Sequence, residues 1–186
     1  MSTETIDLTQ LTGDYTIDAS HSTLGFTARH AMVTKVRGAF NEFEGTVHAD
    51  AADPSKSSAK ITIQAASIDT RNADRDAHLK SNDFFAMDEF PTLTFESTQA
   101  EKVNDETYRV TGDLTVRGVT KPVSIDFEFT GAVEDPWGNT RIGFEGSTSL
   151  NRKDFGLTWN SPLAAGGVLV SEKVNLEFDL SLVKNA

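Results

Sequence analysis

The 186-residue chain has no cysteine, only 5 prolines and no long uninterrupted run of apolar residues. The lack of cysteine excludes disulfides, thiolate catalysis and every zinc or iron–sulfur site built on cysteine. A transmembrane helix needs about 20 mostly apolar residues, so we expect no integral membrane segment. The N-terminus carries neither the basic segment nor the apolar segment of a secretory signal, and we therefore expect a cytoplasmic protein.

Basic residues are few compared with acidic ones. There are 17 Lys and Arg against 28 Asp and Glu, which gives a net charge of −11. Nucleic-acid binding needs a basic stripe that neutralises phosphates, so we expect no nucleic-acid partner. The same balance argues against docking on anionic lipid headgroups, which attract clusters of Lys and Arg.

Apolar residues that alternate with polar ones are abundant. Val123, Ile125, Phe127 and Phe129 alternate with polar side chains, and the stretch 174–182 repeats this period of two. Alternation of this kind predicts β-strands with one buried face and one wet face. Shorter runs show the same period, and turn-forming residues separate them.

Only one stretch departs from this period. Residues 72–80 contain helix formers behind a candidate N-cap, Asn72, which predicts a short helix. The phase of the alternation slips between Phe40 and Phe43, which we interpret as a β-bulge. One short helix among about eight strands predicts an all-β fold, an antiparallel eight-stranded barrel, with a sandwich as the competing architecture. We expect an N-terminal arm over residues 1–13 and a single barrel domain over residues 14–186.

The interior of an eight-stranded barrel is just wide enough for side chains or for one small ligand. Gly112 and Gly146 fall in the inward phase of their strands, so they are expected to leave room there. Two interpretations stay open: phenylalanine rings fill the core, or an apolar tunnel accepts a hydrocarbon. The candidate lining residues are Phe26, Phe40, Ile61, Ile63, Phe84, Phe85, Leu93, Phe95, Leu114, Ile125, Phe127, Phe129, Ile142, Phe144, Gly146, Leu176 and Phe178.

The four histidines, at positions 21, 30, 48 and 78, match no metal-ligand spacing. We therefore expect no metal site and no cofactor. Asp74 and His78 are separated by four residues and should share one face of the expected helix. A solvated or capping network accounts for this pair, and the alternative is a polar site near the barrel mouth.

Several short motifs occur in order along most of the chain. They occupy residues 15–22, 25–26, 29–30, 36–40, 67–70, 75–79, 83–85, 90–91, 112–115, 118–123 and 152–156. Together they resemble the YceI-like family, although each motif alone is weak. The resemblance implies a lipocalin-like barrel that holds a polyisoprenoid, such as an isoprenoid quinone or a polyprenyl phosphate, and it also implies a homodimer.

The leading hypothesis is a noncatalytic protein that binds, carries or stores such a lipid. Arg71, Asp74 and His78 are candidates for contact with its head group, provided that the helix closes the mouth of the barrel. The acidic charge favours a neutral quinone over a phosphate head. The alternative is an enzyme that acts on a small hydrophobic substrate through a His/Asp pair, and an interaction domain without a ligand ranks third.

Overall fold

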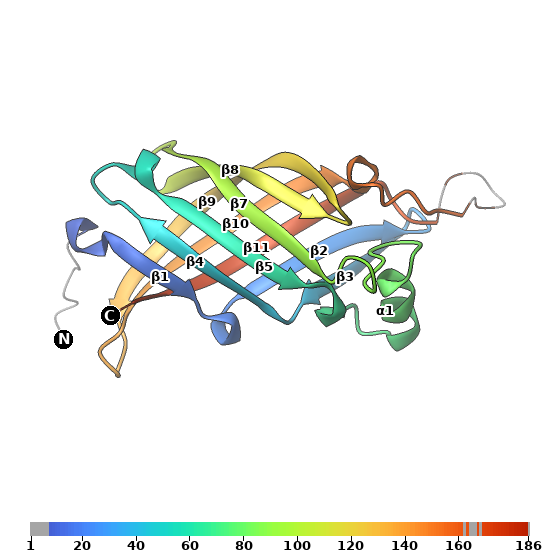
Figure 1. The fold of residues 1–186 in the computed structure, drawn as a ribbon, viewed down its shortest axis with the longest axis horizontal. Helices are drawn as coiled ribbons and strands as arrows, with labels where there is room; N and C mark the ends of the chain where they lie inside the picture. The colour runs from blue at the N-terminus through green and yellow to red at the C-terminus, as the bar shows by residue number, and fades with distance from the viewer. Residues whose placement is uncertain (1–7, 162, 164–166, 168, 186) are drawn as a thin grey trace.

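A closed antiparallel barrel forms the body of the protein (Figure 1). The computed structural model describes residues 8–161, 163, 167 and 169–185. Eight strands pair in a ring, and the first of them pairs with the last. The fold class expected from the alternation is thus confirmed. In ring order the strands are β1 (Gly13–Ile17), β4 (Phe43–Ala49), β5 (Ser58–Gln64), β7 (Thr92–Lys102), β8 (Thr107–Val116), β9 (Val119–Glu134), β10 (Thr140–Asn151) and β11 (Lys173–Lys184).

Three further strands extend the sheet beyond β11. They are β2 (Thr23–His30), β3 (Thr34–Phe40) and β6 (Ile68–Asp69). Strand β11 has different neighbours along its length, because β1 pairs with residues 182–184 and β2 with residues 175–179. The 3₁₀ turn η2 (Ala19–His21) bends the chain between β1 and β2. One end of the barrel is therefore closed by β1, and the other end carries the β2–β3 hairpin.

The phase slip between Phe40 and Phe43 is not a bulge within one strand, as the sequence suggested. Strand β3 ends at Phe40 and β4 begins at Phe43. The two linking residues form hydrogen bonds elsewhere: the Asn41 N–H donates to the Ser67 carbonyl, and the Glu42 carbonyl accepts from the Gln64 N–H. The register shifts that the structure does contain lie between Gly143 and Phe144 and between Ser97 and Gln99.

The expected helix is present as α1 (Ala73–Lys80). Its N-cap is Asn72, whose side chain accepts the Arg75 N–H at 3.0 Å, so this local prediction is confirmed. The helix lies at the same end of the barrel as the β2–β3 hairpin (Figure 1). The remaining 3₁₀ turns are η1 (Leu8–Leu11), η3 (Pro54–Lys56), η4 (Ala65–Ser67) and η5 (Arg152–Phe155).

The segment before β1 packs onto the barrel where the structure describes it. Leu11 is buried, and its carbonyl accepts a hydrogen bond from the Tyr15 hydroxyl at 2.7 Å. Residues 1–7 of the expected N-terminal arm lie outside the described residues. Within the described ranges, no helix has the length and apolar character needed to cross a membrane.

Candidate ligand-binding cavity

An elongated cavity of about 490 Å³ lies inside the barrel. Its lining runs from Val116 and Val170, near the end that carries α1, to Ala51 and Pro54 at the other end. The volume falls within the roughly 300–1,000 Å³ that is typical of small-molecule sites. Most of the lining is aliphatic or aromatic, so the cavity suits a hydrocarbon rather than a polar metabolite.

Every lining residue proposed from the sequence borders this cavity except Gly146. Several of the inward side chains, among them Phe26, Phe129 and Phe178, are only partly buried. An inward side chain in a filled core would be buried on all sides, whereas these still have accessible surface. The partial burial of the inward phenylalanines is what an open interior produces.

The inward glycines do not leave the empty space that the sequence suggested. The ring of Phe127 covers Gly146, and a Cβ atom built at Gly146 would lie 2.7 Å from Cδ1 of that ring. Phe95 covers Gly112 in the same way, with its Cζ atom 2.6 Å from the corresponding Cβ position. Each glycine accommodates a ring from the neighbouring strand, and this packing compensates for its missing side chain.

Charged residues line the cavity only near its ends. Arg152 belongs to the end near α1, and Asp50 and Lys102 belong to the opposite end. The middle of the lining contains no ionisable carboxylate or amine that would have to be desolvated by a hydrocarbon. A charge buried without a partner is costly, so this distribution keeps the middle of the cavity compatible with an apolar chain.

Arg152 is a lining residue that the sequence analysis did not single out as functional. It is 4% exposed, and its guanidinium donates to four backbone carbonyls, those of Leu157, Trp159, Val170 and Ser171. Burial lowers the pKa of Arg152 from its ordinary value. Among the described residues no carboxylate lies within ion-pair distance of Arg152, and Glu172 pairs with Lys153 at 2.7 Å.

These bonds give Arg152 a clear structural role. They fasten the chain on both sides of residues 160–169 to the end of the barrel. The Arg152 guanidinium carbon also lies 6.0 Å from the centroid of the Phe84 ring, which itself borders the cavity. The signal missed in the sequence was an arginine directly after a strand and before an apolar segment, where backbone carbonyls need donors.

Replacing Arg152 with Met should destabilise the protein by about 3 kcal/mol or more. The substitution removes all four hydrogen bonds. The Val170 carbonyl keeps its bond from the Asn160 side chain, whereas the carbonyls of Leu157, Trp159 and Ser171 lose this donor, each at a cost of roughly 1–3 kcal/mol. Urea unfolding of Arg152→Met and of Lys153→Met measures the difference. The exposed Lys153–Glu172 pair should contribute less than about 1 kcal/mol, and equal losses in the two variants would contradict the role given to Arg152.

The candidate head-group residues lie outside the cavity lining. Arg71 and Asp74 are exposed at the start of the α1 region. His78 does not pair with Asp74: its Nε2 atom lies 2.9 Å from a carboxylate oxygen of Asp83. The His78 ring packs edge-on against Phe84, with ring centroids 5.1 Å apart. The structure therefore does not bring the three residues together at the cavity, and their proposed contact with a head group stays a prediction.

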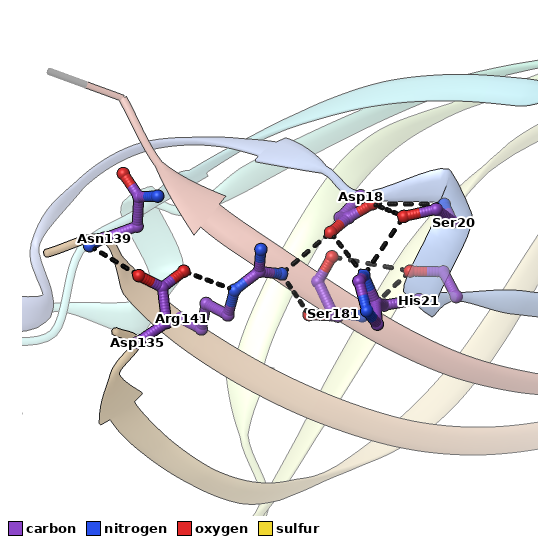
Figure 2. A network of polar contacts seen from close by, with 8 residues as sticks. Asp18, Ser20, His21, Asp135, Asn139, Arg141 and Ser181 are labelled. Carbon is purple, nitrogen blue, oxygen red and sulfur yellow. Dashed lines mark hydrogen bonds and ion pairs between the residues drawn. The ribbon is translucent and has the colours of Figure 1, made fainter. Parts of the chain in front are cut away.

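A polar network joins distant segments outside the cavity (Figure 2). Arg141 lies between two carboxylates, since its Nη1 donates to Asp18 at 2.8 Å and its Nε donates to Asp135 at 2.8 Å. Asp135 is 6% exposed and also accepts the backbone N–H groups of Trp137 and Asn139. The network ties the corner after β1 to the start of β10 and to the β9–β10 turn.

The same network contains a serine, a histidine and an aspartate, but not in the geometry of a nucleophilic triad. Nδ1 of His21 is within hydrogen-bond distance of both Asp18, at 2.8 Å, and Ser20, at 3.1 Å. In a triad the histidine uses one ring nitrogen for the acid and the other for the nucleophile. The arrangement gives no support to the alternative of a His/Asp enzyme at this position.

The network should make stability sensitive to acid. Hydrogen bonds from Ser20 first, and then from Arg141, hold the pKa of Asp18 well below its ordinary value of about 4. Because the pKa of Asp18 is lower in the folded state than in the unfolded state, its carboxylate stabilises the fold at pH values above the unfolded-state pKa. This stabilisation is lost as the pH falls below that value and through the folded-state pKa. Asp18→Asn should therefore lower Tm at pH 7, and the difference in Tm between the variant and wild type should become smaller towards pH 2.

Melting curves at pH 7 and pH 2–3 provide the measurement. The matched control is Asp105→Asn, because the side chain of Asp105 is fully exposed and should contribute little at either pH. A gap between wild type and Asp18→Asn that stays constant with pH would show that the carboxylate charge is not what stabilises the network.

The part of the chain that the structure describes contains no group of side chains placed to hold a metal ion. No cluster of three or more His, Asp or Glu side chains occurs there. The absence of a metal centre in the protein stays a prediction, which metal analysis of the purified protein can test.

An antiparallel barrel around an apolar cavity is the architecture of a class of proteins that hold small hydrophobic ligands. Within that class the family model of the YceI-like domain matches residues 15–182. The chain belongs to the YceI-like family.

Relatives and solved structures agree with this assignment. A UPF0312 protein of Pseudomonas aeruginosa is 44% identical over 149 residues, which cover 79% of this chain and 78% of the relative. The crystal structure of a Campylobacter jejuni YCEI protein matches with a TM-score of 0.74 and 30% identity, covering 85% of this chain and 90% of that one. A polyisoprenoid binding domain from Saccharophagus degradans shares the fold, with a TM-score of 0.70 and 16% identity over 92% of this chain and 98% of that one.

Proposed function

We propose that this protein binds a polyisoprenoid lipid in the barrel without catalysing a reaction, and so carries or stores it. The observation that carries the proposal is the apolar cavity, which runs the length of the barrel and has charged lining residues only near its ends. A prenyl chain is long, flexible and uniformly apolar, and it matches such a lining. The polyisoprenoid binding domain from Saccharophagus degradans, which shares the fold, supports the same ligand class.

The energetics favour tight but unselective binding of the tail. Each buried CH₂ group contributes roughly 0.8 kcal/mol, so a tail of about 30 carbons would contribute on the order of 20 kcal/mol gross. Losses of chain and association entropy offset much of that gain. Apolar burial has no directional preference. The lining therefore discriminates between a tail that fits and one that is too long, but it discriminates little between different tails that fit.

A neutral head group, such as that of an isoprenoid quinone, fits this chain better than a phosphate. The net charge of −11 repels anions at long range. Arg152 is the cation buried in the lining, and four backbone carbonyls already occupy most of its five N–H donors. A quinone carbonyl needs at most one or two donors, whereas a phosphate needs several. The homodimer, the cytoplasmic location and the absence of a cofactor stay predictions beside this proposal.

Gel filtration with a long-tailed isoprenoid quinone tests the proposal. About one quinone per chain should elute with the protein, and a quinone with the same head but no tail should separate from it. In a Trp137→Phe background, Trp159 is the remaining tryptophan of the two, and its ring centroid lies 5.5 Å from that of the cavity residue Phe84. Quenching of Trp159 by the quinone would locate the head at this end of the cavity. Equal retention of the two quinones would overturn the proposal.

A further inference from the structure

The β2–β3 hairpin has a charge opposite to that of the protein as a whole. Residues 19–41 contain no Asp or Glu, although the chain has 28 of them. The hairpin carries Arg29, Lys35 and Arg37, and all three are exposed. At physiological salt the charges of a protein are screened beyond about 8 Å, so a surface that meets this hairpin experiences the local cations more than the net charge.

The strand register places these cations together on the outer face of the barrel. Arg29 pairs directly with Lys35, and Arg37 lies two residues further along β3, so the three share one face of the hairpin. The opposite face, with Phe26 and Ala28, borders the cavity. The hairpin therefore presents a basic outer face and an apolar inner face.

The tip of the hairpin exposes large apolar side chains. Met32 is 64% exposed and Val33 is 75% exposed. Ala31 and Met32 have φ angles of 50° and 65°, a left-handed conformation that residues with side chains seldom adopt and that glycine would adopt without strain. The tip is nonetheless anchored, since the Ala31 N–H donates to the Leu169 carbonyl at 2.7 Å. Strained backbone that surrounding contacts hold in place is a feature of functional loops.

We propose that this tip docks the protein on a bilayer surface that contains anionic lipid. Met32 and Val33 enter the interface between headgroups and acyl chains, and Arg29, Lys35 and Arg37 meet the lipid phosphates. Apolar side chains beside clustered cations are the combination that binds peripheral proteins to such surfaces. The expectation from the net charge, that the protein avoids anionic headgroups, is replaced here by the local distribution of charge.

The docking surface is continuous with the wall of the cavity. His30, at the end of β2, forms a β-bridge with Val170, which lines the cavity. Docking would place this end of the cavity against the membrane, where prenyl lipids reside. The idea that docking gives the cavity access to prenyl lipids rests on the proposed function, whereas the docking itself does not depend on it.

The opposite end of the barrel provides an internal contrast (Figure 1). Trp137 in the β9–β10 turn is 80% exposed, so it is also an apolar side chain at a tip. Residues 131–140 around this turn contain no Lys or Arg, and the exposed carboxylate of Glu134 would meet anionic headgroups unfavourably. Exposed apolar surface alone therefore does not distinguish the two ends, but charge does.

Flotation with vesicles free of isoprenoids tests the docking independently of the proposed function. Wild type should float with vesicles of phosphatidylcholine and phosphatidylglycerol on the order of a hundredfold better than with phosphatidylcholine alone, since each nearby cation contributes roughly fivefold. High salt should abolish the difference. The double variant Met32→Asp, Val33→Asp and the triple variant Arg29→Gln, Lys35→Gln, Arg37→Gln should both lose binding.

The control is Trp137→Asp, which removes exposed apolar surface from the other end and should float like wild type. All these side chains are exposed, so the melting temperatures should stay close to that of wild type. No flotation of wild type, or equal flotation of wild type and the Met32/Val33 variant, would overturn the proposal. Wild type could instead form a dimer that the Met32/Val33 variant does not form, and show no vesicle binding. That result would assign the tip to contact with a second copy of the chain.

Discussion

Phe127→Asp is expected to unfold the protein or to leave it barely folded at neutral pH. Phe127 is 9% exposed, and its ring packs against Phe178, with ring centroids 5.8 Å apart, while also covering Gly146. Truncating a buried phenylalanine costs roughly 3–5 kcal/mol, and placing a carboxylate in an apolar interior adds several more. The sum is comparable to the entire stability of a typical domain, about 5–15 kcal/mol.

Circular dichroism and urea unfolding measure this effect. The conservative control is Phe127→Leu, which keeps the site apolar and should remain folded with a smaller loss of stability. A second control, Glu128→Asp, changes the outward neighbour on the same strand and should be nearly neutral. A folded Phe127→Asp protein with the melting temperature of wild type would mean that the inward phase of β9 is wrong.

Leu176→Trp is expected to reduce the affinity for long-tailed quinones by tenfold or more, with little effect on short-tailed ones. Leu176 lines the cavity near the start of β11, where it pairs with Phe26 and Thr148. An indole at this position would shorten the path open to a tail. A displaced isoprene unit has five carbons, so its loss removes up to about 4 kcal/mol of gross burial, and 1.4 kcal/mol already corresponds to tenfold.

A competition series of quinones with increasing tail length checks this prediction. Glu177→Trp is the matched control, because it adds the same indole to the adjacent, exposed position on the outer face. Gly146→Leu is unsuited to the purpose, since its side chain would collide with Phe127 before it reached the cavity. An equal loss of affinity at every tail length would contradict a continuous tunnel past Leu176.

The barrel could be predicted because its main determinant is local. Alternation in β9 and β11 identifies the inward face of each strand without knowledge of its partners, and almost every inward residue proposed from the sequence does border the cavity. Helix α1 was predictable for the same reason, since Asn72 caps it from the adjacent position. Signals that act within about ten residues are visible in the sequence itself.

The features missed depend on which strands pair and in what register. Gly146 is inward, as its phase indicates, but only the pairing with Phe127 reveals that a ring covers it. Arg141 and Asp18 are separated by 123 residues, and Arg152 is satisfied by backbone carbonyls that carry no sequence signature. Asp83, the partner of His78, lies beyond the end of α1, so helical spacing alone suggested Asp74 instead.

Native mass spectrometry of the purified protein, before and after extraction with organic solvent, tests directly whether the barrel holds a prenyl lipid. The protein should carry an added mass equal to one prenyl-tailed lipid per chain, which extraction removes and a long-tailed isoprenoid quinone restores. A protein that carries no added mass, and that takes up no quinone of any tail length, would contradict lipid binding in the barrel and assign the cavity to another purpose.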